Sequence, residues 1–301
     1  MKMWIQSFID YLRYERNYSV RTLEVYEADL KAFRRFYETL DCELTWASVD
    51  EDVIRQWMLH LMTEQGNSPA SVCRRLSALR SFYRFLLRRE MVKKDPARMV
   101  TGPKKEKPLP AYLKENEMNR LLDETDFGKG FEGERDRLIV QLFYETGMRR
   151  AELVGLDEGD VDFYRRQIKV TGKRNKQRLI PFGDELGSAL QAYMDEKTRE
   201  VPETEDGALF VRADGRRVTD AWVYAMVRRN LSKVTTLKKR SPHVLRHTFA
   251  TTMLNHDVEL EAVKELLGHE SVATTEIYTH TTFEELKNAY GKAHPRARNN
   301  K

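Results

Sequence analysis

The first hundred residues carry apolar side chains at helical spacing. The 3.6-residue period predicts four helices, over residues 4–12, 20–37, 50–66 and 69–89. Ser19, Asp50 and the Ser68-Pro69 pair stand at the starts of the last three, and these residue types favour helix starts. This part of the chain is therefore predicted to be entirely helical.

A stretch without apolar periodicity follows, from residue 101 to residue 110. Its sequence, TGPKKEKPLP, contains three prolines, one glycine and four charged residues. That composition is typical of an extended linker. We expect it to join one domain, residues 1–100, to a second domain, residues 111–301.

The second domain mixes helical periods with alternating segments. Helices are predicted over 135–144, just after 147, over 220–234 and over 283–290, and a short strand over 208–211. Residues 167–170 and 178–182 alternate as strands do, which places Lys173 near the tip of a β-hairpin. The predicted fold class is mainly α with a small β-hairpin in this second domain.

Charge is distributed unevenly along the chain. The 52 basic and 47 acidic residues leave a net charge of +5, but between residues 71 and 107 there are twelve Lys or Arg and only three acids. A basic run is often just a solvated surface, whereas clustered cations are also what neutralises the phosphates of a nucleic acid. We predict that the DNA contacts from this region include Arg74, Arg75, Arg80, Arg84, Lys104 and Lys105.

Composition argues against several classes of protein. The two cysteines, Cys42 and Cys73, have no metal-ligand spacing and are too few for a disulfide framework. No segment reaches the roughly 18 to 20 apolar residues of a membrane span, and the first residues lack the apolar core of a signal peptide. We expect a cytoplasmic protein with no membrane partner.

Residues that suit phosphate chemistry gather between residues 241 and 280. His243 and Arg246 are three residues apart, so on a helix they share a face. Tyr278 follows His269 by nine residues. A tyrosine hydroxyl has an ordinary pKa near 10 and needs nearby cations or a base to become a nucleophile. We interpret Tyr278 as a nucleophile directed at a phosphodiester.

Four motifs, in a fixed order, give the chain a family resemblance. They are TGMRRAEL at 146–153, GKRNK at 172–176 with LIP at 179–181, HVLRHTFAT at 243–251, and LLGH at 266–269 followed by Tyr278. Together they resemble the signatures of the tyrosine recombinases, or phage integrase family, and in particular the Xer type. The resemblance covers the chain nearly end to end. It implies a helical, SAM-like core-binding domain, a linker, and a catalytic domain with a C-terminal interaction helix, the two lobes forming a C-shaped clamp on DNA.

The resemblance implies a role for each matching residue. The two arginines of the family fall on Arg149 and Arg246, and its first histidine falls on His243. Glu152 stands where the family has an acid that helps to hold the site together. The remaining catalytic positions of the family fall on Lys173, His269 and Tyr278.

The chain departs from the family pattern at two basic residues. Arg150 and Arg174 stand where relatives often have small or uncharged residues, which adds positive charge beside the site. Arg174 and Lys176, in the expected hairpin, are added to the predicted DNA contacts.

This set of residues suits transesterification at phosphorus. The pentavalent phosphorane carries extra negative charge, which paired arginine forks stabilise. Lys173 is the best candidate to protonate the leaving 5′ hydroxyl, His243 to accept the tyrosine proton, and His269 to donate to a non-bridging oxygen. A covalent 3′ phosphotyrosine conserves the bond energy. The scheme requires no metal, no ATP and no other cofactor.

The expected activity is site-specific recombination of duplex DNA by a tetramer on two sites. We expect the helix near the C-terminus to pack its Phe283 and Leu286 face on a neighbouring protomer. Resolution of chromosome dimers, near the bacterial nucleoid, is preferred to integration of a phage or mobile element, because no extra module for arm sites precedes the first helices. A type IB topoisomerase and a non-catalytic helical DNA-binding protein are the other hypotheses. The target sequence and the need for a second recombinase or a DNA translocase stay open.

Overall fold

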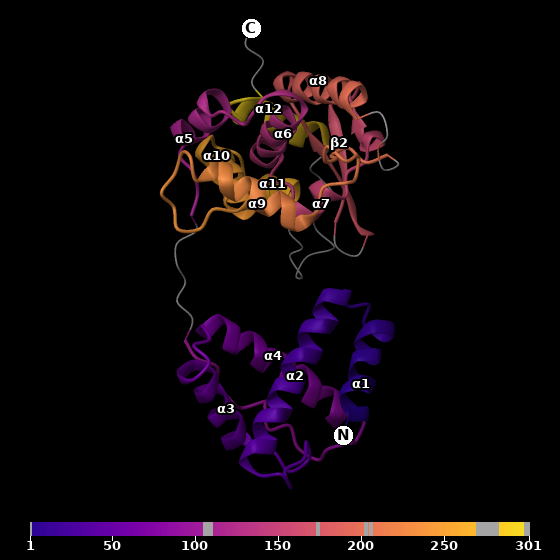
Figure 1. Cartoon of the computed structure of the whole chain (residues 1–301), viewed down its shortest axis with the longest axis vertical. Coiled ribbons are helices and arrows are strands. Elements are labelled where there is room, and N and C mark those ends of the chain that lie inside the picture. The colour runs from indigo at the N-terminus through magenta and orange to yellow at the C-terminus, as the bar shows by residue number, and fades with distance from the viewer. Residues whose placement is uncertain are drawn as a thin grey trace. The chain divides into compact units, whose positions relative to one another are not determined.

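The computed structural model describes residues 2–104, 111–172, 175–201, 204, 207–268 and 283–297. The chain forms two compact units, Met1–Pro108 and Leu109–Lys301 (Figure 1). Each unit has its own hydrophobic core. The predicted fold class, mainly α with a small β-hairpin, is confirmed.

The first unit is helical throughout its regular elements. Ser19, Asp50 and Ser68 cap three of its helices as predicted, since their side-chain oxygens accept hydrogen bonds from backbone N–H groups in the first turn. The elements are α1 (Lys2–Asp10), the π-helical turn η1 (Tyr11–Glu15), α2 (Val20–Leu40), α3 (Glu51–Thr63) and α4 (Pro69–Arg88).

Aromatic side chains fill the core of the first unit. Trp46 and Trp57 are fully buried, and the Phe33 ring centroid lies 4.8 Å from that of Trp57. The Tyr83 hydroxyl, also buried, donates to the Trp46 carbonyl at 3.1 Å. Large rings with this much contact area give a small helical unit a rigid core.

The second unit begins with short helices and continues into longer ones. Its elements are α5 (Glu115–Asn119), the π-helical turn η2 (Arg120–Glu124), α6 (Gly130–Thr146), α7 (Arg150–Val154), the 3₁₀ turn η3 (Glu158–Asp160), β1 (Val161–Asp162), β2 (Gln167–Thr171), β3 (Gln177–Pro181), α8 (Asp184–Glu200), α9 (Asp220–Leu231), α10 (Pro242–Asn255), α11 (Leu260–Leu267) and α12 (Phe283–Ala293).

The predicted hairpin is confirmed as the pair β2–β3. The two strands are antiparallel, with Val170 opposite Arg178 and Ile168 opposite Ile180, and β1 extends the sheet beside β2. Ile168, Val170 and Ile180 are buried. Side chains two apart on a strand share a face, so the position of Arg178 also faces inward.

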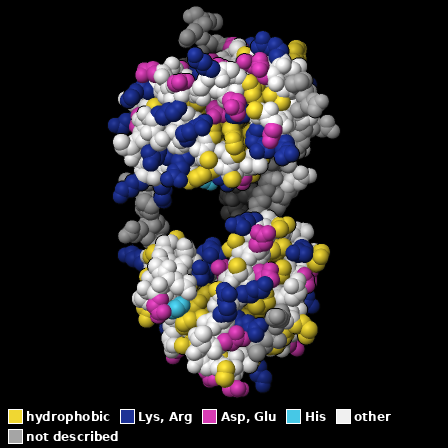
Figure 2. All heavy atoms as spheres, viewed as in Figure 1, with side chains coloured by type: hydrophobic (Ala, Val, Ile, Leu, Met, Phe, Trp, Pro, Cys, Tyr) yellow, Lys and Arg dark blue, Asp and Glu magenta, His cyan; other side chains and the backbone are white. Residues whose placement is uncertain are grey.

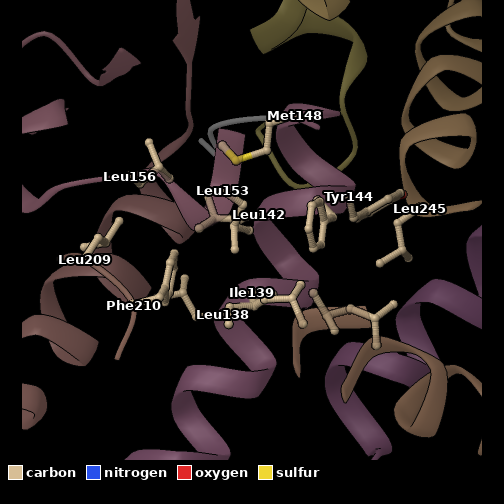
Figure 3. Close-up of a cluster of buried hydrophobic side chains, with 14 of the residues drawn as sticks. Leu138, Ile139, Leu142, Tyr144, Met148, Leu153, Leu156, Leu209, Phe210 and Leu245 are labelled. Carbon is tan, nitrogen blue, oxygen red and sulfur yellow. The ribbon is translucent and has the colours of Figure 1, made fainter. Parts of the chain in front are cut away.

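Helix α6 forms the centre of the second unit. Every residue from Leu138 to Thr146 is buried, which explains why apolar side chains lie on every side of this segment and why its polar residues, such as Gln141 and Glu145, hydrogen-bond one another. Figure 3 shows Leu138, Ile139 and Leu142 among side chains from distant parts of the chain, including Phe210. The helix packs against α8 and α10.

Gly147, the C-cap residue of α6, starts the turn that leads to α7. Its φ of 58° lies in the left-handed region that favours glycine. A Cβ atom here would also lie 2.4 Å from the Phe249 ring. The turn leads through Met148 to Arg149, the N-cap residue of α7.

Helix α12 packs within its own unit, against α10, α11 and β3. Leu286 is 5% exposed and Tyr290 is 2% exposed, in a cluster with Phe249 and Leu267. The Leu286 face is covered within this unit, and the expected contact of the helix with a neighbouring protomer stays a prediction. An amphipathic pattern identifies the buried face of a helix, not the partner that covers it; the side chain of Phe283 lies outside the described part.

Two further elements differ from the sequence predictions. Residues Ala208 and Val211 form isolated bridges with Asp157 and Arg217 rather than a strand. Helix α8 was not predicted. Within the described ranges no helix is both long enough and apolar enough to cross a membrane.

Candidate active site

Arg149 is fixed by a carboxylate one helical turn away. Its backbone N–H donates to Glu152 Oε2 at 2.6 Å, and its Nη1 donates to Glu152 Oε1 at 2.8 Å. The Glu152 side chain is 2% exposed. Burial alone would raise the pKa of Glu152, but hydrogen bonds from Arg178 and Arg149 and their charges lower it below its ordinary value. The carboxylate is therefore ionised at neutral pH.

Arg178, on strand β3, forms a bidentate ion pair with the same carboxylate. It was not identified from the sequence. Its Nη1 donates to Glu152 Oε1 at 2.7 Å and its Nη2 to Glu152 Oε2 at 2.9 Å. The signal that could have found it is its position: Ile180, two residues on, is buried on the same face of the strand. A basic residue at an inward position of a strand needs a buried acidic partner.

Arg246 projects from α10 into the same region. Its Nη1 donates to the Gly147 carbonyl at 2.6 Å, and its Nη2 to the Leu267 carbonyl at 2.7 Å. Burial, and then the positive charge of Arg149, lowers the pKa of Arg246 to about 10, against an opposing effect of Glu152. The guanidinium stays protonated at neutral pH, and only 8% of this residue is exposed.

The C-terminal end of α11 joins the three arginines. Three consecutive carbonyls accept one guanidinium each: Leu266 from Arg178 Nε at 2.9 Å, Leu267 from Arg246, and Gly268 from Arg149 Nη2 at 2.6 Å. The last carbonyls of a helix lack intrahelical partners and carry its negative dipole end, so cations satisfy them. The segment with the predicted residues His269 and Tyr278 continues from this end of α11.

His243, one turn before Arg246 on α10, lines a pocket of 460 Å³ together with both predicted arginines. Burial, followed by the charges of Arg246 and Arg150, lowers the pKa of His243 below its ordinary value. The imidazole is therefore neutral at pH 7 and able to accept a proton.

A second group of basic residues lines the other wall of this pocket. Arg150 Nε and Nη2 each lie 3.1 Å from an oxygen of Asp220, and its guanidinium lies 5.7 Å from the centre of the Tyr224 ring. Figure 2 shows Lys and Arg side chains gathered over the α9–α10 side of this unit. The basic residues that line the pocket here are Arg150, Arg228, Lys238, Lys239 and Arg240.

The structure thus brings Arg149, Arg246 and His243 together around one pocket, with Glu152 behind them. Lys176 adjoins the hairpin turn, where its carbonyl accepts from the Gly172 N–H at 2.7 Å. The other predicted site residues of this unit lie outside the described residues: Lys173, Arg174, His269 and Tyr278.

The predicted DNA contacts of the first unit differ in their surroundings. Arg74 and Arg75 lie beside the buried carboxylate of Asp29, which accepts hydrogen bonds from Nη1 and Nη2 of Arg74. Arg80 donates to the carbonyls of Ala97 and Val100 at 3.2 and 2.5 Å. These hydrogen bonds attach the segment around residues 97–100 to α4. A role of Arg80 in DNA binding stays a prediction. Arg84 and Lys104 are exposed, and Lys105 lies outside the described part.

Comparison with known proteins identifies the family. Residues 111–285 match the phage integrase family, and residues 5–90 match the N-terminal SAM-like domain of phage integrases. The tyrosine recombinase XerC of Azotobacter vinelandii is 41% identical over 307 residues, covering 100% of this chain and 99% of the relative. The tyrosine recombinase XerC of Chlorobaculum tepidum is 37% identical over 319 residues, covering 98% of this chain and 95% of the relative.

A solved structure shares the fold. The XerH site-specific recombinase bound to its difH substrate, in a pre-cleavage complex, has a TM-score of 0.70 and 23% sequence identity, covering 95% of this chain and 83% of that chain. The family match spans more than half of the chain, and the relatives align with nearly all of it. The chain therefore belongs to the phage integrase family, the tyrosine recombinases.

Proposed function

We propose that the protein is a site-specific DNA recombinase that cuts and rejoins duplex DNA through a 3′ phosphotyrosine. The observation that carries this proposal is the pocket in which Arg149 and Arg246 are held rigidly beside His243. Fixed cations that converge on one point are what a phosphoryl transition state requires. The two XerC relatives, which align over nearly the whole chain, support the same activity.

In the proposed reaction the Tyr278 hydroxyl attacks the scissile phosphorus. A bond forms between the tyrosyl oxygen and phosphorus, while the bond from phosphorus to the 5′ oxygen breaks. Arg149 and Arg246 stabilise the charge on the non-bridging oxygens, and His243 receives the tyrosyl proton. Rejoining reverses these steps with a 5′ hydroxyl from another strand.

The leaving 5′ oxygen needs a proton, which we assign to Lys173. A lysine ammonium can serve as a general acid toward a leaving oxygen. His269 serves as a further donor to a non-bridging oxygen. The reaction exchanges one phosphodiester for another, so its chemistry calls for neither a metal nor a nucleotide.

Duplex DNA and further copies of the recombinase are the proposed partners. Four protomers on two sites are needed to exchange both strands of two duplexes, since each active site cuts one strand. We propose resolution of chromosome dimers as the biological role, in line with the XerC names of the relatives. Basic residues of both units, including Arg84, Lys104, Lys176 and Arg228, supply phosphate contacts.

A suicide substrate, nicked next to the cleavage point so that the cut end is lost, tests the activity. The wild-type protein is expected to form a DNA adduct that survives denaturant. Tyr278→Phe abolishes it because the nucleophile is gone. Tyr164→Phe, at a side chain that is 96% exposed, is the matched control and keeps it.

Two results would redirect the proposal. If no adduct forms with chromosomal, plasmid or element DNA, the protein is a DNA-binding protein without catalytic activity. Relaxation of any supercoiled plasmid, without site preference, would indicate a topoisomerase. Sequencing of the DNA trapped in adducts from cells decides the role: one chromosomal locus supports dimer resolution, and the ends of a mobile element support integration.

A further inference from the structure

Arg178 occupies a place in the site that the proposed reaction does not yet use. It lies on β3, opposite Val170 of β2, with 16% of its side chain exposed. From there it reaches two elements of the second unit at once: Glu152 of α7 and the Leu266 carbonyl at the end of α11.

The Glu152 carboxylate is shared evenly between two arginines. Its Oε1 accepts from Arg149 Nη1 at 2.8 Å and from Arg178 Nη1 at 2.7 Å; its Oε2 accepts from the Arg149 backbone N–H at 2.6 Å and from Arg178 Nη2 at 2.9 Å. A bidentate fork fixes the plane of a carboxylate as well as its position. The plane of Glu152 in turn directs the Arg149 guanidinium.

Two glycines leave room for this arrangement. A Cβ atom at Gly268 would lie 3.1 Å from Arg178 Nη1, and one at Gly172 would lie 3.2 Å from Glu152 Oε1. Both contacts are tighter than ordinary van der Waals distance. The backbone of the hairpin and of the α11 end therefore closes tightly around the Glu152–Arg178 pair.

We propose that Arg178 is a positioning residue for strand cleavage: it holds Glu152 and the end of α11 in register, and through them it aims Arg149 at the scissile phosphate. This inference rests on the proposed function. Arg178 acts through its neighbours, because its fork is fully engaged by Glu152 and its Nε by Leu266. Lysine cannot replace it, since an ammonium group is a point charge without a planar fork.

The test compares two substrates in single-turnover strand cleavage. One has the natural scissile phosphate, and the other has a methylphosphonate, in which a methyl group replaces a charged non-bridging oxygen. Arg149 matters less on the neutral substrate because there is less charge to stabilise. Substitution of a residue that aims Arg149 must show the same difference between the two substrates. Substitution of a residue that only stabilises the fold slows cleavage of both substrates equally.

We expect Arg178→Gln to slow cleavage of the natural substrate by roughly 10- to 100-fold, as a misplacement of about 1 Å does, with DNA affinity within about threefold of wild type. The reduction in cleavage rate caused by Arg178→Gln is expected to be smaller on the methylphosphonate, and the same is expected of Arg149→Ala. Arg178→Lys is not expected to restore the rate. Arg166→Gln is the control, because Arg166 forms an exposed ion pair with Asp184 at 2.7 Å.

Equal losses on both substrates, or a full rate in Arg178→Lys, would overturn the proposal. A double-mutant comparison guards against variants that fold poorly. In a Glu152→Gln background, Arg178→Gln is expected to add little to the loss, because the two residues act as one unit. Additive losses would contradict the role. A wild-type protein that cleaves neither substrate contradicts the recombinase activity itself, so the two failures are distinguishable.

Discussion

At the scale of single residues, the site depends on one buried negative charge among three positive ones. Glu152 contacts Arg149 and Arg178 directly, and its charge also acts on Arg246. Without it, three neighbouring guanidinium groups, two of them largely removed from water, would repel one another. A buried ion pair adds little net stability, but removing one partner leaves the other uncompensated.

Glu152→Gln is therefore expected to destabilise the second unit by about 3 kcal/mol or more, the usual result of unpairing a buried charge. The amide keeps the shape of the side chain but turns an N–H₂ group toward an arginine donor. Urea denaturation measures the change. Asp184→Asn removes a carboxylate from an exposed ion pair and is expected to change stability by less than about 1 kcal/mol; equal effects of the two substitutions would contradict this account.

The sequence identified some of these residues and not others, for a physical reason. Arg149, His243 and Arg246 stand in motifs with local spacing that a reader can recognise, and the fold brings them to one pocket. Arg178 is 26 residues from Glu152, and no local spacing links the two. Only the return of β3 beside β2 creates that contact.

At the scale of elements, helix caps were predictable because they are local. Ser19, Asp50 and Ser68 cap their helices through bonds within one turn. Helix α8 was missed although Leu186, Leu190 and Tyr193 are buried at helical spacing, because a charged and polar sequence surrounds them. The packing of α12 on α10, α11 and β3 was not predicted, because packing between distant elements leaves no local pattern.

The docking of α12 buries ionisable groups at the end of α6. The Tyr290 hydroxyl and Gln141 Nε2 donate to the Glu145 carboxyl at 3.4 and 2.8 Å, and His294 Nε2 lies 3.3 Å from the Tyr144 carbonyl. Burial raises the pKa of Glu145 from 4.5 to about 8 and lowers that of His294 from 6.5 to about 3. Both groups are therefore neutral in the folded protein near pH 7.

These shifts predict how stability depends on pH. Between pH 4.5 and 8 the folded state keeps a proton on Glu145 that the unfolded state releases, so stability falls as pH rises. Between pH 3 and 6.5 the unfolded state holds a proton on His294 that the folded state lacks, so stability rises with pH. From pH 4.5 to 6.5 the two effects on stability oppose each other. From pH 6.5 to 8 only the effect of Glu145 remains.

Glu145→Gln is expected to remove the fall in stability between pH 6.5 and 8, whose slope is at most about 1.4 kcal/mol per pH unit. Denaturant unfolding of the whole chain at several pH values in this window measures it. Glu124→Gln, at an exposed carboxylate of the same unit, leaves the slope as in wild type. A slope that persists in Glu145→Gln would show that α12 does not bury this group in solution.

At the scale of the whole molecule, the chain is two compact units with separate cores, and its positive charge is concentrated in particular places. The net charge is only +5. Twelve basic residues lie between 71 and 107, and several more line the pocket beside His243. The first concentration was visible in the sequence because it is contiguous. The second is assembled from α7, α9 and the segment before α10, so only separate parts of it, such as Arg150 and the run from Lys238 to Arg240, were visible in the sequence.

The carboxylate of Asp220 pairs with Arg150 of the pocket wall, and this pair offers a test of how the positive charge is used. Asp220 engages both nitrogens of the Arg150 fork at 3.1 Å and so offsets its charge before DNA binds. Asp220→Asn frees that charge, so the affinity for non-specific duplex DNA is expected to rise. Each additional phosphate contact steepens the dependence of log affinity on log salt by about one.

Fluorescence anisotropy of a labelled duplex, titrated between about 50 and 200 mM salt, measures this slope. The variant Asp220→Asn is expected to be steeper than wild type, and the double variant with Arg150→Ala is expected to lose the gain, because the freed cation is then absent. Asp214→Asn removes a carboxylate that pairs with Arg212 outside the pocket wall and serves as the charge-matched control. If Asp214→Asn steepened the slope as much as Asp220→Asn, the effect would come from net charge alone and not from a phosphate bound by Arg150.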